Sequence, residues 1–512
     1  MTKRFYVTTP IYYVNGAPHI GHAYTSIAAD VLARFKRLDG FDVFFLTGTD
    51  EHGQKVEQAA RAAGLEPQAY TDKISQDFRD MSDAMGVSYD DWIRTTEQRH
   101  KASCTELWKR IEAAGDIYLG HYEGWYSVRD EAFYDEDELV TLPGGTKIAA
   151  KSKAPVEWVK EPSYFFRLSA WGDRLLRFYE ENPDALAPSS SKNEILSFIR
   201  GGLRDLSVSR TTFSWGIPVP DAPGHVMYVW LDALTNYITA AGFPNSAAPR
   251  WDFWPADVHL VGKDIIRFHA VYWHAFLMSA GIEPPKRVSS NGWWVVDGEK
   301  MSKSLGNVVE PRALAKTFGL DQIRYFLLRE KPFGADGSLN HQAIISRMNV
   351  ELANDLGNLA QRSLSLIAKN CDGKLPGRGP ATAEDTALLD AANALPDLVR
   401  AAMDRQAFHE SLEDIWKVIR SANAYIDHQA PWALRKTDPV RMAAVLRVLV
   451  DTMRVVTTLL QPFMPESIGR MMDQLGVPAD ARLLADLAAP LADGTQLPVP
   501  RGVFPRYVEP TA

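Results

Sequence analysis

The N-terminal part of the chain alternates between two hydrophobic periodicities. Residues 4–9 and 41–48 are strand-like in composition, whereas apolar residues recur at helical spacing over 19–38, and a second helix is expected over 54–64. The resulting order β-α-β-α predicts an α/β fold with a doubly wound parallel sheet. In such sheets ligands bind beyond the carboxyl ends of the strands.

Beyond residue 116 the pattern changes twice. Short β-like pieces mixed with turns indicate an insertion into the sheet domain, after which strand and helix patterns resume at 225–242 and 257–281. From 341 the chain reads as long helices, which predicts a helix bundle. The expected regions are the first half of the sheet domain at 1–116, the insertion at 117–225, the second half at 226–290, a loop region at 291–340, the bundle at 341–484 and an extended tail at 485–512.

The sequence carries no signal for export or for a membrane. The N-terminus has basic residues but lacks the apolar segment of a signal peptide. The longest apolar helix, over 445–463, is interrupted by Arg447, Asp451 and Arg454, whose charges would be costly in lipid. That helix is expected to lie in a core.

Charge and cysteine content narrow the function classes. The formal net charge is −8 at pH 7, so any contact with nucleic acid has to depend on a local patch. Only two cysteines occur, Cys104 and Cys371, which excludes a disulfide framework and a four-thiolate zinc site. We expect a cytoplasmic location, with both cysteines as small buried residues.

Residues 18–24 read PHIGHAY, with two histidines three apart and a glycine between them. Such histidines most often pack or lie at the surface, and zinc is disfavoured because no third ligand of the H-E-x-x-H kind is near. Another reading is anion binding, because the start of a helix directs N–H groups and a positive dipole at the ligand, and Gly21 permits close approach. His19 and His22 could then donate to phosphate oxygens.

A second polar stretch, GEKMSKSLGN at 298–307, places Lys300 and Lys303 among serines and glycines. Alone it reads as a solvated loop. Together with a histidine pair at a strand end, the two lysines suit a triphosphate whose developing charge must be neutralised.

These two stretches contain HIGH and KMSKS, which are identical to the two signatures of class I aminoacyl-tRNA synthetases. The resemblance implies a Rossmann-type catalytic domain with an all-α anticodon-binding bundle, and a loop and stem-contact region at 291–340. His19 and His22 would stabilise the phosphates of ATP while a carboxylate attacks the α-phosphorus, and Lys300 and Lys303 would hold the departing pyrophosphate. Further ATP contacts are implied for Gly21, Met301, Ser302 and Ser304.

Several stretches narrow the resemblance to the methionyl-tRNA synthetase family, among them TTPIYYVNGAPHIGHAY, GTDEHG, YVWLDALTNYI and GKDIIRFHAVYWHAFL. The resemblance implies that Asp50 holds the ammonium group of methionine and that an aromatic, apolar pocket accepts the thioether. The implied pocket residues are Ile11, Tyr13, Trp230, Tyr237, Ile265, Phe268 and His269. For Tyr237 and Phe268 a plain core role is the alternative.

The resemblance also assigns residues to the nucleoside. Gly262 and Asp264, at a strand end, would meet the ribose hydroxyls of ATP, and Asp264 could in addition be the N-cap of the helix that follows. Arg210 resembles a family arginine near the adenylate.

In the helical part the resemblance implies that Asn358, Arg362 and Trp432 contact the CAU anticodon. Asn358 and Arg362 are four residues apart and so share a helix face, and unpaired bases stack on tryptophan. The alternatives are solvation for the pair and packing for Trp432, which follows Pro431 at a helix boundary.

One departure from the family concerns metal. Many relatives carry cysteine pairs for zinc in the inserted segment, and this chain has Ser127 and Asp130 where the first pair would fall. Because these side chains cannot replace thiolates at a tetrahedral site, we expect no zinc and a segment held by packing and hydrogen bonds.

The expected activity is that of a methionine–tRNA ligase. Methionine and ATP with Mg²⁺ would give methionyl-adenylate, and a ribose hydroxyl at the 3′ end of tRNA(Met) would take the methionyl group. The alternatives are another class I synthetase, for isoleucine, valine, leucine or cysteine, a tRNA-binding paralogue without catalysis, and a small-molecule nucleotidyltransferase. The chain ends shortly after the bundle without an appended domain, so we expect a monomer.

Overall fold

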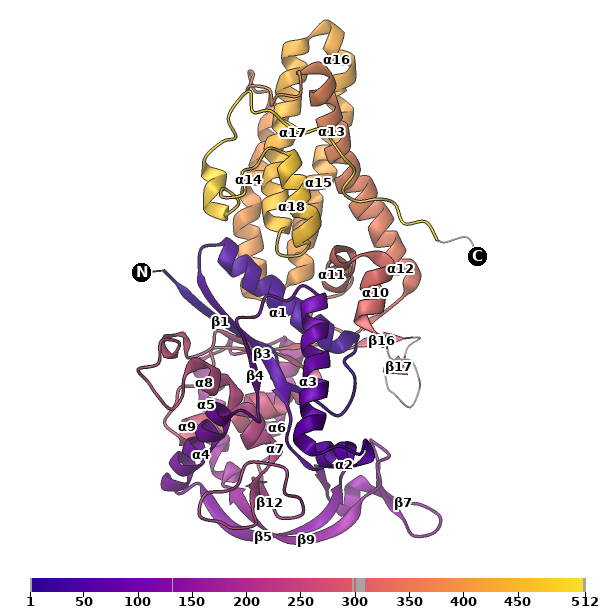
Figure 1. The fold of residues 1–512 in the computed structure, drawn as a ribbon. Helices are drawn as coiled ribbons and strands as arrows, with labels where there is room; N and C mark the ends of the chain where they lie inside the picture. The colour runs from indigo at the N-terminus through magenta and orange to yellow at the C-terminus, as the bar shows by residue number, and fades with distance from the viewer. Residues whose placement is uncertain (1, 131, 297–298, 301–308, 510–512) are drawn as a thin grey trace.

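A seven-stranded parallel sheet forms the centre of the computed structural model, which describes residues 2–130, 132–296, 299–300 and 309–509 (Figure 1). The strands follow the order β10 (Leu186–Ala187), β15 (Val288–Asn291), β14 (Val258–Gly262), β1 (Arg4–Thr8), β3 (Asp42–Asp50) and β2 (Tyr12–Tyr13), with β4 (Asp91–Arg94) also paired to β3. Every pairing in this sheet is parallel, as the β-α-β-α pattern predicts.

Both faces of the sheet are buried, which explains why its central strands read as continuous apolar runs. Val7 and Phe45 belong to the core on one face, and Tyr6 and Phe44 to the core on the other. The helices that cover the sheet are α1 (Ile20–Leu38), α2 (Gln54–Ala62), α3 (Pro67–Ala84), α4 (Gln98–Ala113), α5 (Gly172–Glu181), α6 (Ser189–Arg200), α7 (Val229–Leu234), α8 (Asn236–Ala241) and α9 (His274–Ser279).

Helix α1 lies between the sheet and the bundle (Figure 1), and its core is continuous with that of the bundle. Two ion pairs fix the carboxyl end of α1 to the bundle, Lys36 to Asp404 at 2.5 Å and Arg400 to Asp39 at 2.9 Å. The helix that opens with the histidine pair is therefore held from both sides.

The inserted segment is built on a long antiparallel ribbon at the opposite end of the molecule from the bundle (Figure 1). Its sheet contains β11 (Leu206–Ser207), β9 (Glu157–Phe166), β5 (Ile117–Ser127) and β6 (Ala132–Tyr134), and a separate hairpin joins β7 (Leu139–Thr141) to β8 (Lys147–Ala149). Short single-turn helices occur at Glu136–Glu138, Leu168–Trp171 and Trp251–Phe253.

The chain crosses between the insertion and the central sheet more often than the sequence pattern indicates. Strand β10 falls within 117–225 yet pairs with β15 of the central sheet. The strand expected at the start of 225–242, β13 (Val226–Met227), pairs instead with β12 (Ser209–Arg210) outside that sheet. The β-like piece at 216–220 forms only an isolated bridge from Pro218. Local composition cannot separate these cases, because pairing partners are chosen by tertiary packing.

A small sheet follows the central one, with β16 (Trp294–Val296), β17 (Glu299–Lys300) and β18 (Gly337–Ser338), and then α10 (Pro311–Phe318) and α11 (Leu320–Arg329). The β-like stretch from 288 to 296 is thus split between two sheets. The break lies at Gly292, where a Cβ would stand 2.1 Å from the Ala335 carbonyl oxygen, so only glycine permits this close approach.

The bundle contains α12 (His341–Ser346), a π-helical stretch η7 (Arg347–Gly357), α13 (Asn358–Asn370), α14 (Ala383–Asp404), α15 (Phe408–Gln429), α16 (Pro431–Thr437), α17 (Pro439–Leu460) and α18 (Pro465–Gln474). The apolar helix expected over 445–463 lies in α17, which ends at Leu460, and Pro465 opens α18. The bundle itself is as predicted.

Two arginines of α17 bind the C-terminal segment. Arg447 donates to the Leu491 carbonyl at 2.7 Å, and Arg454 donates to the Asp486 carbonyl at 2.7 Å. The segment begins with a short helix η8 (Leu484–Ala488), and beyond it the described residues are irregular and pack along the bundle through Leu497 and Phe504. Among the described residues, no helix combines the length and apolarity needed to span a bilayer.

Candidate active site

A cavity of about 900 Å³ opens at the carboxyl ends of β1, β3, β14 and β15. Helix α1 leads from β1 to β3, and β14 lies on the other side of β1, so the cavity is at a switch point of the sheet. The predicted residues that line it are Ile11, Tyr13, His19, Gly21, His22, Asp50, Arg210, Trp230, Tyr237, Gly262, Asp264, Ile265, Phe268 and His269. Segments as far apart as residues 11 and 269 thus meet in one space.

The rest of the predicted ATP site cannot be described in the same way. Met301, Ser302, Lys303 and Ser304 lie outside the described residues. Lys300 ends β17, whose partner β16 follows Trp293 and begins at Trp294, two residues that line the cavity.

The two histidines cap the helix that they begin. His19 is the N-cap of α1, its Nδ1 accepts from the Gly21 N–H at 3.1 Å, and His22 Nδ1 accepts from the His19 N–H at 3.1 Å. The rings stack with centroids 3.8 Å apart. A Cβ on Gly21 would lie 2.9 Å from the His19 ring, which explains the glycine between the histidines.

This arrangement fixes the tautomer of both rings. A nitrogen that accepts from a backbone N–H carries no proton, so neutral His19 and His22 hold their proton on Nε2. Each ring can then donate from Nε2 to an anion near the positive end of α1. The interpretation of His19 and His22 as phosphate donors therefore gains support over their interpretation as packing residues or metal ligands.

The end of β3 and the loop after it carry three side chains into three environments. Asp50 lines the cavity, whereas Glu51 is fully buried and receives two hydrogen bonds from Arg94, at 2.6 and 2.9 Å. His52 lies beside Asp232 of α7, with Nδ1 2.7 Å from the carboxylate. Each neighbour of Asp50 is thus fixed by a separate partner.

An aromatic wall faces Asp50 across the sheet ends. Trp230 of α7 and Phe268, at the start of the π-helical turn η5 (Phe268–Trp273), stack with ring centroids 3.7 Å apart. Both rings are only half-buried, so the core alternative for Phe268 loses support.

Tyr237 and His269 form a buried polar pair in the same wall. The Tyr237 hydroxyl lies 2.7 Å from His269 Nε2, and His269 Nδ1 lies 3.0 Å from the Ile265 carbonyl oxygen. Because that carbonyl can only accept, Nδ1 carries the proton and Tyr237 donates to Nε2. Burial lowers the pKa of His269 to about 4, so the ring is neutral at physiological pH. Tyr237 is only 1% exposed, so it serves both the core and the cavity.

One end of the cavity, where the sequence predicts the nucleoside contacts, is formed at the carboxyl ends of β14 and β15. The Trp293 indole N–H donates to Asp264 at 3.3 Å, and Lys263 lies 4.0 Å from the Trp293 ring centroid. The N-cap alternative for Asp264 is wrong, because Asp264 lies inside the short helix η4 (Lys263–Ile265), whose N-cap is Gly262 and has no side-chain cap. The backbone has already turned into the helix before Asp264 is reached.

Arg210 reaches the cavity from the inserted segment. The side chain is 2% exposed, lies 3.6 Å from Glu161 and sits 3.8 Å from the Tyr228 ring centroid. It is a buried cation at the cavity wall.

The predicted anticodon residues gather on the bundle. Arg362 pairs with Asp427 at 2.6 Å and lies 5.2 Å from the ring centroid of Trp432. Asn358 is exposed one turn before Arg362, and Trp432 is 44% exposed, so packing does not account for its ring. An exposed indole beside an arginine can stack with an unpaired base.

In the inserted segment, polar side chains bond with one another at the position where the family resemblance implies the first pair of zinc ligands. The Asp130 N–H donates to Ser127 at 3.3 Å, and the Asp130 carboxylate accepts from Tyr134 at 2.7 Å and from Ser152. Elsewhere His100, Cys104 and Asp232 form a buried group of possible metal ligands. Cys371, expected to be buried, is half-buried because it follows the end of α13.

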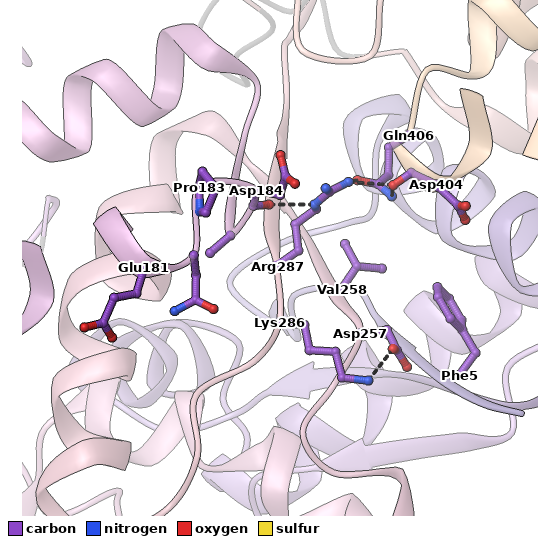
Figure 2. Close-up of a pocket in the computed structure, with 12 residues that line it drawn as sticks. Phe5, Glu181, Pro183, Asp184, Asp257, Val258, Lys286, Arg287, Asp404 and Gln406 are labelled. Atoms are coloured by element: carbon purple, nitrogen blue, oxygen red, sulfur yellow. Dashed lines mark hydrogen bonds and ion pairs between the residues drawn. The ribbon is translucent and has the colours of Figure 1, made fainter. Parts of the chain in front are cut away.

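A second cavity, of about 410 Å³, lies where the sheet domain meets the turn after α14 (Figure 2). Arg287 donates to the carbonyl oxygens of Asp184 and Asp404, and Lys286 pairs with Asp257 at 2.8 Å. Since the Arg287–Asp404 contact crosses from the sheet domain to the bundle, we interpret this cavity as a joint between domains.

Sequence reasoning missed several residues of the larger cavity. Trp293, Asn236 and Tyr12 line it, as do Lys55 and Arg267. Trp293 lies two residues after the end of β15, which is the signal that could have identified it. The His52–Asp232 contact joins residues 180 positions apart, and the sequence offered no signal for it.

Comparison with known proteins agrees with this geometry. A model of the class I tRNA synthetases (M) matches residues 5–147 and 146–364, and a model of the anticodon-binding domain of methionyl-tRNA ligase matches residues 375–510. The fold and the site define a class I aminoacyl-tRNA synthetase with an anticodon-binding bundle. The methionine–tRNA ligase of Mesorhizobium japonicum is 58% identical over 99% of this chain and 98% of its own length. The chain belongs to the methionyl-tRNA synthetase family.

Solved structures support the same assignment. The Mycobacterium tuberculosis methionyl-tRNA synthetase in complex with methionyl-adenylate is 54% identical, with a TM-score of 0.96 over 99% of this chain and 100% of that one. Its free form gives a TM-score of 0.91 at 50% identity over 100% of this chain and 99% of that one. The activity is ATP-dependent ligation of methionine to tRNA. These relatives give no support to the other class I amino acids, the inactive paralogue or the nucleotidyltransferase.

Proposed function

We propose that the 900 Å³ cavity is where methionine is activated, with the residue roles given below. The observation that carries the proposal is the meeting of the α1 histidines, Asp50 and the Trp230–Phe268 wall in one space at the sheet switch point. An anion site, a carboxylate and an apolar wall are the three features that ATP and methionine together require.

Asp50 binds the ammonium group of methionine, and the thioether lies against the aromatic wall. Sulfur contacts with Trp230 and Phe268 are favourable, whereas a charged side chain would lose its hydration without a partner. The neutral His269, held by Tyr237, adds no charge to this pocket. Ile11, Tyr13 and Ile265 complete it.

His19 and His22 donate from Nε2 to the phosphates while the methionine carboxylate attacks the α-phosphorus. Neutral imidazoles at a helix N-terminus offer fixed donors that need no reorganisation as charge moves toward pyrophosphate. The support is their tautomer, which the two Nδ1 hydrogen bonds determine. Lys300 and Lys303 hold the pyrophosphate, with Met301, Ser302 and Ser304 around it. Mg²⁺ enters with ATP, because it prefers phosphate oxygens and water to a protein cage.

Gly262 and Asp264 receive the ribose, and Arg210 lies beside the adenylate. In the second step the 2′-hydroxyl of the terminal adenosine attacks the activated carbonyl, and AMP leaves. Asn358, Arg362 and Trp432 read the CAU anticodon, supported by the Arg362–Trp432 contact and the exposed indole. These contacts supply the local patch that a net charge of −8 makes necessary.

The remaining proposals concern the state of the protein. The inserted segment holds no zinc, because Ser127, Asp130 and Tyr134 already satisfy one another. The chain acts as a monomer in the cytoplasm, in keeping with its two free cysteines. The proposed domain limits are those of the sequence, except that β10 at 186–187 belongs to the central sheet through its pairing with β15.

The test is methionine-dependent exchange of pyrophosphate into ATP by Asp50→Asn. Losing a charge-assisted hydrogen bond to the ammonium group should raise the KM for methionine about 10- to 100-fold, with the KM for ATP unchanged. The control is Asp252→Asn, which removes an exposed carboxylate paired only with Arg4. An unchanged KM for methionine in Asp50→Asn would show that another group binds the ammonium.

A further inference from the structure

A buried group of one carboxylate and two histidines lies behind the cavity. Asp232 of α7 stands 2.7 Å from His52 Nδ1 through one oxygen and 2.8 Å from His100 Nε2 through the other. The exposed fractions of the side chains of Asp232, His52 and His100 are 1, 4 and 0%. None of the three lines the cavity, and the roles proposed above use none of them.

The group joins the two sides of the methionine pocket. Asp232 follows Trp230 by two residues in α7, and Ala233 and Leu234 next to it also line the cavity. His52 follows Asp50 by two residues in the loop after β3. The Asp232–His52 contact therefore ties the loop that begins directly after Asp50 to the helix that carries Trp230.

Two further contacts make the loop a rigid connection. The Trp215 indole N–H donates to the Glu51 carbonyl oxygen at 2.6 Å, and the Trp215 ring packs edge-on against His52 with centroids 5.5 Å apart. Because Arg94 holds the Glu51 side chain, the loop has little freedom to absorb a displacement of His52. A shift of His52 would move Asp50.

The charge on Asp232 is what gives these contacts their strength. Burial by itself raises the pKa of Asp232, but His52 and His100 lower it to about 2, so the carboxylate stays ionised. Hydrogen bonds to an ionised group are roughly twice as strong as those between neutral groups.

The distances fit hydrogen bonds rather than a metal ion. His100, Cys104 and Asp232 offer three possible ligand atoms within 4.8 Å of one another. Nitrogen and oxygen ligands at tetrahedral zinc lie roughly 3.3 Å apart. The His100 Nε2 to Asp232 Oδ1 distance is 2.8 Å, and the second Asp232 oxygen is bonded to His52.

We propose that Asp232 is a positioning residue for amino-acid recognition, which fixes Asp50 relative to the Trp230 wall through His52. The inference rests on the proposed role of Asp50 as the ammonium ligand. Asp232 touches neither substrate, and its effect on methionine passes through Asp50.

The experiment measures tRNA-independent pyrophosphate exchange by Asp232→Asn, which keeps the volume of the side chain and removes its charge. The KM for methionine should rise about tenfold, with kcat and the KM for ATP within about twofold of the wild type. The competitive inhibitor 4-(methylthio)butanoate, which lacks the ammonium group, should bind the variant and the wild type equally. His52→Gln is a second variant, for which we expect the same rise in the KM for methionine with kcat and the KM for ATP nearly unchanged. It serves as the test if Asp232→Asn does not fold.

The double variant supplies a further test, because residues acting through one contact are not additive. Adding His52→Gln to Asp232→Asn should raise the KM for methionine by less than the product of the two single effects. The control is Asp385→Asn in the bundle, which neutralises an equally buried carboxylate bonded to Arg441 and Tyr425. It should leave the KM for methionine unchanged.

Four results would overturn the inference. The first is a fall in kcat of Asp232→Asn with an unchanged KM for methionine, and the second is that the inhibitor without an ammonium group is weakened as much as methionine. The third is full additivity of the two substitutions in the double variant. The fourth is stoichiometric zinc in the wild type that is lost in Cys104→Ser. The two proposals fail differently. If Asp50→Asn raises the KM and Asp232→Asn does not, the inference fails alone, whereas an unaffected Asp50→Asn overturns the proposed role of Asp50 itself.

Discussion

Lys331 is a buried cation beneath the active-site cavity, and its titration should be measurable in the stability of the protein. Its ammonium group donates to the Ala335 carbonyl at 2.6 Å and to the Tyr24 hydroxyl at 3.3 Å, and lies 4.4 Å from the Tyr24 ring centroid. The residue is 5% exposed. Burial lowers the pKa of Lys331 from 10.5 to about 7, against the smaller opposing effect of Asp336.

The direction in which the free energy of unfolding changes with pH follows from proton uptake on unfolding. Because the pKa is lower in the folded than in the unfolded chain, unfolding binds protons between about pH 7 and 10, and the free energy of unfolding therefore rises with pH across that window. Uptake of one full proton on unfolding raises the free energy of unfolding by about 1.4 kcal/mol per pH unit. Because Lys331 in the folded protein is only half-titrated near pH 7, the free energy of unfolding rises by about 2 kcal/mol between about pH 7 and pH 9. Below about pH 7 the full penalty of the buried charge is present.

The perturbation is Lys331→Met, which fills a similar volume without a titratable group. Urea unfolding followed by tryptophan fluorescence gives the free energy of unfolding of both proteins at about pH 7 and pH 9, so that all other titrating groups cancel in the difference. The wild type should gain about 2 kcal/mol relative to the variant over this range. Lys160→Met, which removes an exposed lysine paired with Glu123, is the matched control and should show no such change. A wild-type to variant difference that is the same at both pH values would refute the reasoning.

Three further predictions concern the proposed sites. His22→Ala should lower pyrophosphate exchange about 100-fold while the lost cap costs only about 1 kcal/mol of stability, and a loss of activity matched by a loss of folded protein would contradict the catalytic role. Trp432→Ala should weaken charging of tRNA(Met) and leave pyrophosphate exchange nearly intact, because the indole lies on the bundle, so an equal loss of both activities would show that the two sites are not separate. Elemental analysis of the purified protein should find no stoichiometric zinc, and one zinc per chain that is retained in Cys104→Ser would contradict the proposal for the inserted segment.

Much of the architecture was predictable because its signals are local. The alternation of strand and helix patterns in the first 64 residues and the helical periodicity beyond 341 correspond to β1, α1, β3 and the bundle. The positions of the insertion's strands were less predictable. Strand β10 has only two residues and gains its place by pairing with β15, a hundred residues later, which local propensity does not encode.

The candidate site likewise combines features that the sequence predicted with features that only the structure revealed. Its residue types came from short motifs, and the resemblance to a family placed them in roles. The structure added the reason for the HIGH spacing: an N-cap at His19 and an N3 residue at His22 are three apart, so each Nδ1 can accept a backbone N–H at the helix start. It also corrected Asp264 from an N-cap to a residue inside a short helix.

By itself the sequence determined which segments form strands and helices and which chemical groups are available, because both depend on neighbours a few positions apart. Only the tertiary structure decided which of those groups meet. Asp50 and Trp230 face one cavity because β3 ends and α7 begins at the same edge of the sheet, and His52 meets Asp232 across 180 residues of chain. Contacts of that kind depend on how the layers pack, and no local pattern specifies them.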